Sequence, residues 1–221
     1  MVGFIISFIY RDSLFDLLLR PGDYPKLYSF ELTGILNASM KVSLMGGVVI
    51  ALPVFVYQMV MFLSPGLKPK EKRILYVMLP GVVLFFLAGV AFSYFVVVPS
   101  VVTFLLTFDT NIAIQQVGIA SYINAVLSLL FWMGVGFEAP FIMYLLTVIG
   151  IATPKFFSGK RRLWVVIAFI LAAIITPTPD PINQSLVAGP FIILYEIGII
   201  FSRIAKRKPK PRTALAPEGG R

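Results

Sequence analysis

The chain has 221 residues, of which 58% are hydrophobic and only 13% charged, with a net charge of +9 and a mean hydropathy of +0.91. Soluble domains are about 45–50% apolar and about 25% charged, so this composition is that of a membrane protein. Cysteine and histidine are absent from the sequence. Their absence excludes disulfides, thiolate or imidazole metal sites and histidine-dependent catalytic triads, and we expect neither a cofactor nor enzymatic activity.

Uncharged apolar stretches predict the membrane spans. A helix needs about 20 apolar residues to cross a hydrocarbon core about 30 Å thick. In chain order, we predict a partial span at 1–10, long spans at 42–62, 74–98 and 123–149, a short span at 163–176 and a last one at 182–204. These form a single transmembrane domain, 1–204, followed by a basic disordered tail at 205–221. The segment 99–116 is expected to be an external loop with a short interfacial helix.

The last two predicted spans are short. Pro177 and Pro179 limit the first of them to about 14 residues, or about 21 Å. The second reaches normal length only by including Gln184 and Glu196. We therefore expect the membrane to be thinned around this pair.

Positive charge predicts the orientation. Fifteen of the nineteen basic residues fall in the loop at 68–73, the loop at 155–162 and the tail from 203 onward, which lie on one side of the membrane if the spans are right. The positive-inside rule makes that side cytoplasmic. The other four share the segment 11–41 with acidic residues, which suits an external loop of mixed charge.

This orientation requires a crossing before Arg11, yet Met1–Tyr10 offers only ten residues, or about 15 Å. A basic segment and a small-residue cleavage site, the marks of a signal peptide, are not visible there. We therefore expect the sequence to begin partway down a first helix whose cytoplasmic half is missing.

Glu138 interrupts an otherwise apolar stretch. A charged side chain at the centre of a spanning helix costs about 2.5–3.5 kcal/mol on insertion scales, so Glu138 should face a cavity or a partner rather than lipid. A bond to a neighbouring helix that only fixes packing is the alternative, and we favour a functional role.

Two loops carry further candidates. Glu71 stands among four basic residues in the turn at 62–73, where a cationic ligand could pair with it. From composition alone, a solvated charge cluster is the favoured interpretation of that turn. At the external side, the segment 176–184 brings Asp180 and Gln184 between the two short helices, in a rigid proline turn with an Asn/Asp cap.

Prolines also occur inside the predicted spans, at 53, 80, 140 and 190. They should kink their helices and favour a concave wall over a straight bundle.

Seven segments, in order and at matching spacings, resemble the TatC family, the multi-spanning core of the twin-arginine protein translocase. They are MKVSL at 40–44, ALPVFVYQ at 51–58, FLSPGL at 62–67, AFSYFVVVP at 91–99, GVGFEAP at 134–140, TPTPDPINQ at 176–184 and AGPFIILYEIG at 188–198. The resemblance implies six transmembrane helices in a curved, cup-like all-α arrangement. It also implies residence in the cell inner membrane with both termini cytoplasmic.

The resemblance also implies roles for individual residues. Phe62, Pro65 and Glu71 match the cytoplasmic surface that binds the twin-arginine signal peptides of folded cargo, where a carboxylate can accept paired hydrogen bonds from a guanidinium. Glu138 matches an intramembrane contact with the single-span partners TatA and TatB. Asp180 and Gln184 match an external loop and partner-helix contact. Transport in the family is driven by the proton gradient, and other TatC copies and the lipid bilayer are the remaining expected partners, with no nucleic acid.

One expected motif is missing. The family begins with a cytoplasmic segment of the type HisLeuXxxGluLeuArg, which has no counterpart here. Two other classes of protein remain as alternatives. A proton-coupled small-solute transporter could use Glu138, although no inverted repeat is visible. An intramembrane hydrolase would need a serine with lysine or a carboxylate pair.

Overall fold

The computed structural model describes residues 1–22, 27–63, 69–107, 116–176 and 180–206. Within these residues the chain is helical apart from loops and one pair of bridge residues, Tyr28 and Gly118. The elements are α1 (Val2–Ile9), α2 (Arg11–Leu19), η1 (Arg20–Gly22), α3 (Gly34–Leu63), α4 (Pro69–Phe92), η3 (Ser93–Val97), α5 (Val98–Thr107), α6 (Ile119–Phe137), α7 (Ala139–Ile149), α8 (Pro154–Gly159), α9 (Arg161–Ile175) and α10 (Pro181–Lys206). The predicted tail lies outside the described residues from 207 onward.

Four of the described segments are long and apolar enough to cross a membrane. They are Gly34–Met59, Met78–Leu105, Ile119–Ile149 and Pro181–Ala205. Helix α9, with 15 residues, and helix α1, with 8, complete a set of six segments. The prediction of an all-α membrane fold is confirmed.

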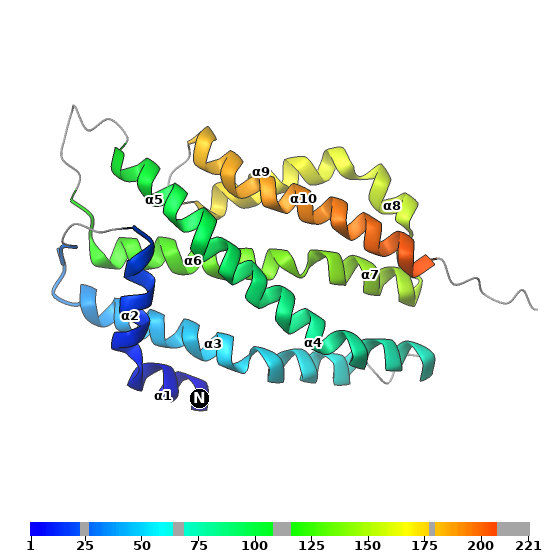
Figure 1. The fold of residues 1–221 in the computed structure, drawn as a ribbon, viewed down its shortest axis with the longest axis horizontal. Helices are drawn as coiled ribbons and strands as arrows, with labels where there is room; N and C mark the ends of the chain where they lie inside the picture. The colour runs from blue at the N-terminus through cyan, green and yellow to red at the C-terminus, as the bar shows by residue number, and fades with distance from the viewer. Residues whose placement is uncertain (23–26, 64–68, 108–115, 177–179, 207–221) are drawn as a thin grey trace, which may run out of the picture.

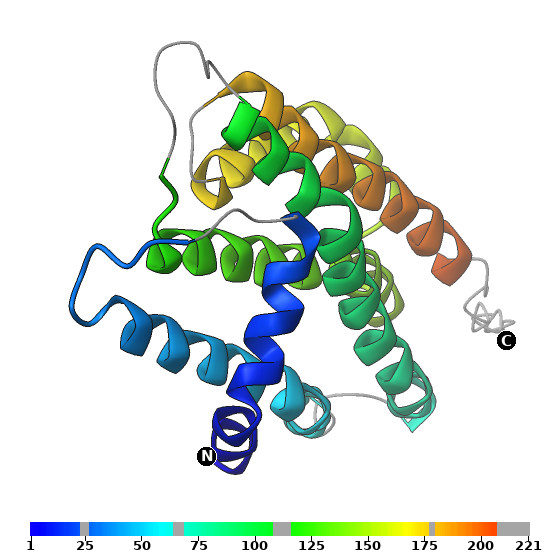
Figure 2. The same cartoon turned by 60° about the vertical axis from the view of Figure 1, so that its left-hand side comes forward.

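The helices form a curved wall rather than a closed bundle. Helix α3 contacts α1, α4 and α6, whereas α10 contacts α7 and α9. Figures 1 and 2 show α3 and the α9–α10 pair on opposite sides of α6, with α4 and α5 running diagonally across. The N-terminus lies partway along the long axis, beside the middle of α3 (Figure 1).

Helix α6 is the centre of the core. Its buried positions recur every three or four residues, as expected for one face of a helix. They are Tyr122, Ile123, Val126, Leu129, Leu130, Met133 and Gly134. The same core includes Val97 and Val101 from the second long segment, Met78–Leu105, and Ala168 and Ala172 from α9. Small alanines on α9 let this short helix pack closely against its neighbours.

The third predicted span, 74–98, is longer than the sequence suggested. The predicted span stops just before Pro99, and a proline inside a regular helix removes a backbone donor and clashes with the carbonyl four residues earlier. Instead a π-helical turn, η3, precedes the proline, and the N–H of Val98 donates to the carbonyl of Ser93. The wider turn accommodates Pro99, so the helix continues as α5 to Thr107. A helix therefore occupies 98–107, where an external loop with only a short interfacial helix was expected.

Other boundaries also differ from the expected ones. Helix α3 begins at Gly34 rather than at Val42, which places Lys41 inside a helix. Helix α10 has 26 residues and is not short, while α9 is. The helices continue through Pro53, Pro80 and Pro190, and the chain breaks between α6 and α7 next to Pro140.

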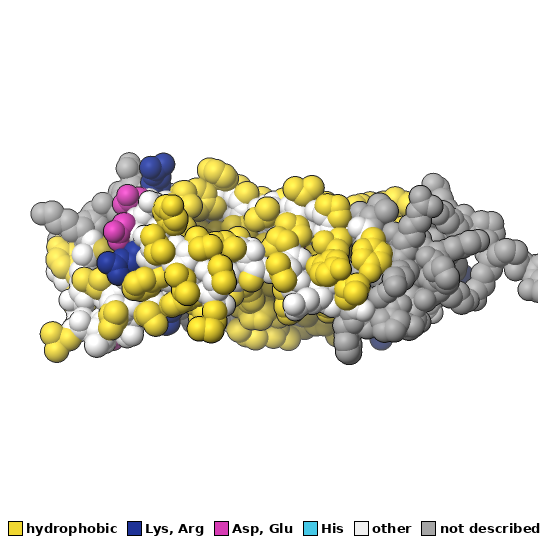
Figure 3. All heavy atoms as spheres, turned by 90° about the horizontal axis from the view of Figure 1, so that it is seen from below, with side chains coloured by type: hydrophobic (Ala, Val, Ile, Leu, Met, Phe, Trp, Pro, Cys, Tyr) yellow, Lys and Arg dark blue, Asp and Glu magenta, His cyan; other side chains and the backbone are white. Residues whose placement is uncertain are grey.

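The long axis has two distinct ends. We call the "α2 end" the one where α2, the start of α3 and the start of α6 meet, and the "α8 end" the one with α8, the end of α3, the start of α4 and the end of α10 (Figure 1). Tyr28 ties the α2 end together, since its N–H donates to the carbonyl of Val117 and its carbonyl accepts from Ile119. Figure 3 shows hydrophobic side chains covering one face between the charged residues of the α2 end and the residues drawn in grey.

Candidate functional site

The predicted site residues fall in three separate places along the long axis. The end of α3 and the start of α4 lie at the α8 end, Asp180 directly precedes α10 at the α2 end, and Glu138 lies between them, at the junction of α6 and α7 (Figure 1). The structure therefore does not bring them together into a single site, and each is described by itself.

The predicted recognition turn is described only by its backbone. Phe62 is in the last turn of α3, and Glu71 is in the first turn of α4. Pro65 and the side chains of Phe62 and Glu71 lie outside the described residues. At the same end of the molecule lie the exposed basic residues Lys155, Lys160, Arg161, Arg162 and Arg203.

Glu138 occupies the break between α6 and α7. Pro140 cannot donate to the carbonyl of Gly136, so the helix is interrupted and the N–H of Glu138 bonds three residues back, to the carbonyl of Val135, at 3.1 Å. The regular ladder resumes when Ile142 donates to the carbonyl of Glu138 at 3.0 Å. The carboxylate is thus held at a proline kink, 19 residues or about 28 Å from the start of α6.

The side chain of Glu138 is half-buried, and its Oε1 atom is buried without a hydrogen-bond partner among the described residues. The carboxyl group lies against the backbone of Phe86 on α4. Helix α10 packs closely against the same kink, since a Cβ atom added to Gly198 would lie 3.3 Å from the Cα atom of Pro140. A buried acceptor without a partner costs about 1–3 kcal/mol or more, so a polar side chain supplied by another helix would be stabilised here.

Asp180 and Gln184 both make contacts within the chain. Oδ1 of Asp180 accepts from the N–H of Asn183 at 2.8 Å, which caps α10 as the sequence predicts, and Pro181 occupies the first helical position. The Nε2 atom of Gln184 donates to the carbonyl of Phe169 on α9 at 2.8 Å. Gln184 therefore braces the two last helices at the α2 end.

Several polar contacts that link helices were not predicted from the sequence. Arg161 pairs with Glu196 at 2.7 Å, and Thr147 and Ser202 share a hydrogen bond of 2.6 Å. The indole N–H of Trp164 donates to the carbonyl of Phe191 at 3.1 Å. Glu196 stands out as a charge within an apolar run, but its partner lies 35 residues away and no local pattern identifies it.

Lys41 is a similar case at the other end of the molecule. Its Nζ atom donates to Oδ1 of Asn124 at 2.7 Å, which joins α3 to α6. The sequence places Lys41 among the mixed charges of an external loop. The structure instead places it two turns inside α3, where the amide of Asn124 satisfies the ammonium group.

Apolar segments of membrane-spanning length, charged residues at both ends and a carboxylate within the third long segment define the class of this protein. It is a polytopic helical membrane protein.

Comparison with known proteins identifies the family. The model of the family described as Sec-independent protein translocase protein (TatC) matches residues 1–190. The TatC protein of Carboxydothermus hydrogenoformans is 34% identical over 94% of this chain and 86% of its own length, and that of Aquifex aeolicus is 37% identical over 95% and 89%. A crystal structure of the twin-arginine translocase receptor TatC superposes with a TM-score of 0.82 and 35% identity, over 93% of this chain and 92% of that one. The chain belongs to the TatC family of Sec-independent protein translocase proteins.

Proposed function

We propose that this protein is the signal-peptide receptor of a twin-arginine translocase in the cell inner membrane, with both termini in the cytoplasm. The observation that carries the proposal is the superposition, over nearly the whole of both chains, with a solved twin-arginine translocase receptor. In this proposal the turn with Phe62, Pro65 and Glu71 receives the paired arginines of the signal peptide of folded cargo.

The chemistry of the α8 end supports this assignment. A carboxylate accepts two parallel hydrogen bonds from a guanidinium, a geometry that an ammonium group cannot reproduce. The basic residues at the same end repel a peptide that carries only diffuse positive charge, so they sharpen the selection of a peptide that can reach Glu71. The same basic residues orient this end toward the cytoplasm.

A charge reversal tests the receptor site. Glu71→Lys should reduce photocrosslinking of a twin-arginine signal peptide, from a photoreactive residue at Phe62, by at least tenfold, because two cations would then meet. Glu31→Lys is the matched control, since it reverses an exposed acid at the α2 end and should leave crosslinking unchanged. Unchanged crosslinking in Glu71→Lys would refute the assignment.

We further propose that Glu138 contacts a polar side chain of the single-span partners TatA and TatB. The orphaned Oε1 atom supports this role, because a donor from a partner helix would satisfy it. Glu138→Ala should weaken copurification of the TatB partner severalfold and leave signal-peptide crosslinking intact, whereas Glu138→Gln should retain part of the partner binding. Loss of peptide crosslinking with normal copurification would reverse the two roles.

Asp180 and Gln184 complete the proposed partner surface at the external side. The cap made by Asp180 and the brace made by Gln184 fix the α9–α10 pair, so a partner helix would meet a rigid edge. Gln184→Leu keeps the size of the side chain but removes the brace, and it should lower crosslinking of partner helices to α9 without changing signal-peptide capture.

A further inference from the structure

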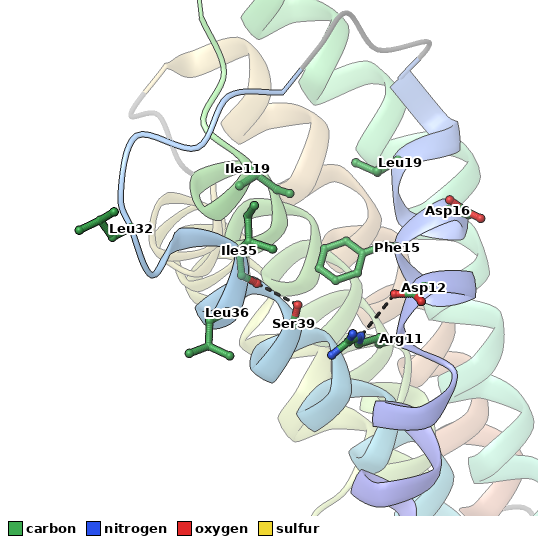
Figure 4. Close-up of a pocket in the computed structure, with 10 residues that line it drawn as sticks. All are labelled: Arg11, Asp12, Phe15, Asp16, Leu19, Leu32, Ile35, Leu36, Ser39 and Ile119. Atoms are coloured by element: carbon green, nitrogen blue, oxygen red, sulfur yellow. Dashed lines mark hydrogen bonds and ion pairs between the residues drawn. The ribbon is translucent and has the colours of Figure 1, made fainter.

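A cavity lies between α2 and the first turns of α3 at the α2 end (Figure 4). Its volume is about 620 Å³, within the usual range of about 300–1,000 Å³ for sites that bind small molecules. Its walls are largely apolar and include Phe15 from α2, Ile35 and Leu36 from α3, and Ile119 from α6. Ser39 also lines it, but its hydroxyl donates to the carbonyl of Ile35, so this wall offers no free donor.

The rim of the cavity on α2 carries both signs of charge. Nε of Arg11 lies 3.3 Å from Oδ1 of Asp12, and the guanidinium is also positioned over the ring of Phe8, 5.1 Å from its centroid. Asp12 is 91% exposed, so its other carboxylate oxygen can accept a hydrogen bond from outside the protein. Asp16 lies one turn further along α2 on the same rim and has no ion-pair partner among the described residues.

An exposed apolar ridge leads from the cavity along α3 toward the middle of the membrane. It consists of Leu36, Met40, Leu44 and Val48, spaced four residues apart, and each is at least 39% exposed. Residues with this spacing form a continuous ridge on a helix surface. The ridge extends about 18 Å along the helix, close to the depth of about 15 Å that one leaflet contributes to a hydrocarbon core.

We propose that this cavity and ridge bind one phospholipid of the external leaflet that carries a primary ammonium headgroup, of the phosphatidylethanolamine type. Arg11 contacts the phosphate, for which a guanidinium is well suited. Asp12 and Asp16 accept hydrogen bonds from the ammonium group, and an acyl chain lies along the α3 ridge. The lipid fills the space that opens where α2 diverges from α3.

The charges of the rim predict selectivity among lipids. A choline headgroup has the same charge as an ethanolamine headgroup but no N–H donor, so the carboxylates gain no hydrogen bond from it. A glycerol headgroup carries no cation, so the two carboxylates gain no ionic partner and face a lipid with a net negative charge. The site therefore prefers ethanolamine over both of the other headgroups.

Native mass spectrometry of the full chain tests the proposal. The protein is released from nanodiscs with equal parts of palmitoyl-oleoyl phosphatidylethanolamine, phosphatidylcholine and phosphatidylglycerol, and its retained lipids are counted. We expect retained phosphatidylethanolamine to exceed each of the others at least fivefold. The double variant Asp12→Asn/Asp16→Asn should bring this excess below twofold, and Arg11→Gln should lower the retention of all three lipids.

Matched controls separate the site from general effects of charge and polarity. Glu31→Gln neutralises another exposed acid at the α2 end, outside the cavity, and should keep the preference. Leu36→Asn should abolish lipid retention. Val54→Asn should not, although it lies on the same helix and is nearly equally exposed, since Leu36 is 60% exposed and Val54 58%. Because all these side chains are exposed, circular dichroism should show unchanged helicity.

Three results would overturn the proposal. Equal retention of the three lipids would show that the protein has no headgroup-selective site. An ethanolamine preference that persists in Asp12→Asn/Asp16→Asn would show that the selective site lies elsewhere on the protein. A dimer that binds no lipid and dissociates in Leu36→Asn would identify the cavity as a contact between two copies of the chain.

Discussion

Two tyrosine hydroxyls hold the end of α2. The last carbonyls of a helix have no intrahelical donor. Here the hydroxyl of Tyr94 donates to the carbonyl of Leu17 at 2.7 Å, and that of Tyr122 donates to the carbonyl of Leu18 at 2.8 Å. The donors come from the second and third long segments, Met78–Leu105 and Ile119–Ile149, so these bonds fasten a short N-terminal helix to the central wall.

Removal of one hydroxyl should loosen this connection. Tyr122→Phe leaves the carbonyl of Leu18 without this donor in a buried place, which costs about 1–3 kcal/mol. We expect a lower Tm and faster amide hydrogen exchange over 11–19. Tyr10→Phe, which removes a hydroxyl from a side chain that is 63% exposed, is the control and should change neither. Equal exchange in the two variants would contradict the role of Tyr122.

At this scale, the sequence predicts contacts between near neighbours better than distant ones. The cap of α10 by Asp180 is predictable because capping depends on residues three apart. The pairing of Arg161 with Glu196 and of Lys41 with Asn124 depends on how helices pack, and the partners are 35 and 83 residues apart. The roles of Glu71 and Glu138 come from resemblance rather than from local chemistry.

Helix α9 is too short to span an ordinary bilayer. Its 15 residues rise about 22 Å, against a core of about 30 Å. Arg161, the first residue of α9, pairs with Glu196, which lies ten residues before the end of α10. Helix α9 therefore starts about 15 Å short of the end of α10. The deficit in length therefore falls at the α8 end.

Depth measurements can detect the resulting thinning. Spin labels at Leu163 and Ile174, both exposed on α9, should both report positions near the headgroups, because the membrane contracts to the length of the helix. Labels at Leu44 and Phe55 on α3 have the same spacing of eleven residues, and at least one should lie deep in the core. A deep position for either α9 label would contradict local thinning.

The contact between α1 and α3 depends on the absence of side chains. Glycine has no Cβ atom, and one added to Gly47 would lie only 2.9 Å from the backbone nitrogen of Phe4 and 3.2 Å from the carbonyl carbon of Gly3. Backbone atoms cannot turn aside as a side chain can. Such small-residue contacts are a common means of helix association in membranes.

Glycine-to-alanine changes should have opposite effects at two sites. Alanine is favoured over glycine in a helix by about 1 kcal/mol. Gly189→Ala on α10, with nothing within 4 Å of its Cβ position, should therefore keep or raise the Tm. Gly47→Ala should lower the Tm, because α1 must move away, and exchange over 2–9 should accelerate. A Tm that rises in both variants would show that α1 contributes little.

The sequence predicts where apolar elements exist better than where they end. The long spans are recognised by hydropathy, which sums over many residues. The continuation past Pro99 and the break at Glu138 depend on how a single proline is accommodated, by a π-turn in one case and by a kink in the other. Sequence alone does not distinguish these two outcomes.

Over the whole molecule, charge separates toward the two ends of the long axis. The α8 end carries Lys155, Lys160, Arg161 and Arg162, and the α2 end carries acidic and basic residues together. This distribution is predictable from the sequence because it needs only the order of the spans. The packing of α3 and α10 on opposite sides of α6 is not, since lipid-facing and protein-facing residues are alike in hydropathy.

The orientation can be tested with introduced thiols, because the chain contains no cysteine of its own. In intact cells, a membrane-impermeant maleimide should label Glu31→Cys at the α2 end. It should label Lys155→Cys only after the cytoplasmic face is opened, because the basic end is retained inside. The opposite labelling pattern would show that the chain has the opposite orientation to the one proposed.

The π-turn at Ser93–Val97 also absorbs a residue within the second long segment, Met78–Leu105. Its bond spans five residues instead of four, so the turn holds one residue more than a regular α-turn. Deletion of one residue there would restore an ordinary helix, and the residues after it would keep the faces that they have now. The same deletion in a regular turn of α4 would rotate everything after it by about 100°. Val98 and Val101 would then turn away from the core with no change in their identity. The π-turn is therefore a place where this segment can lose a residue and still keep its alignment with the neighbouring helices.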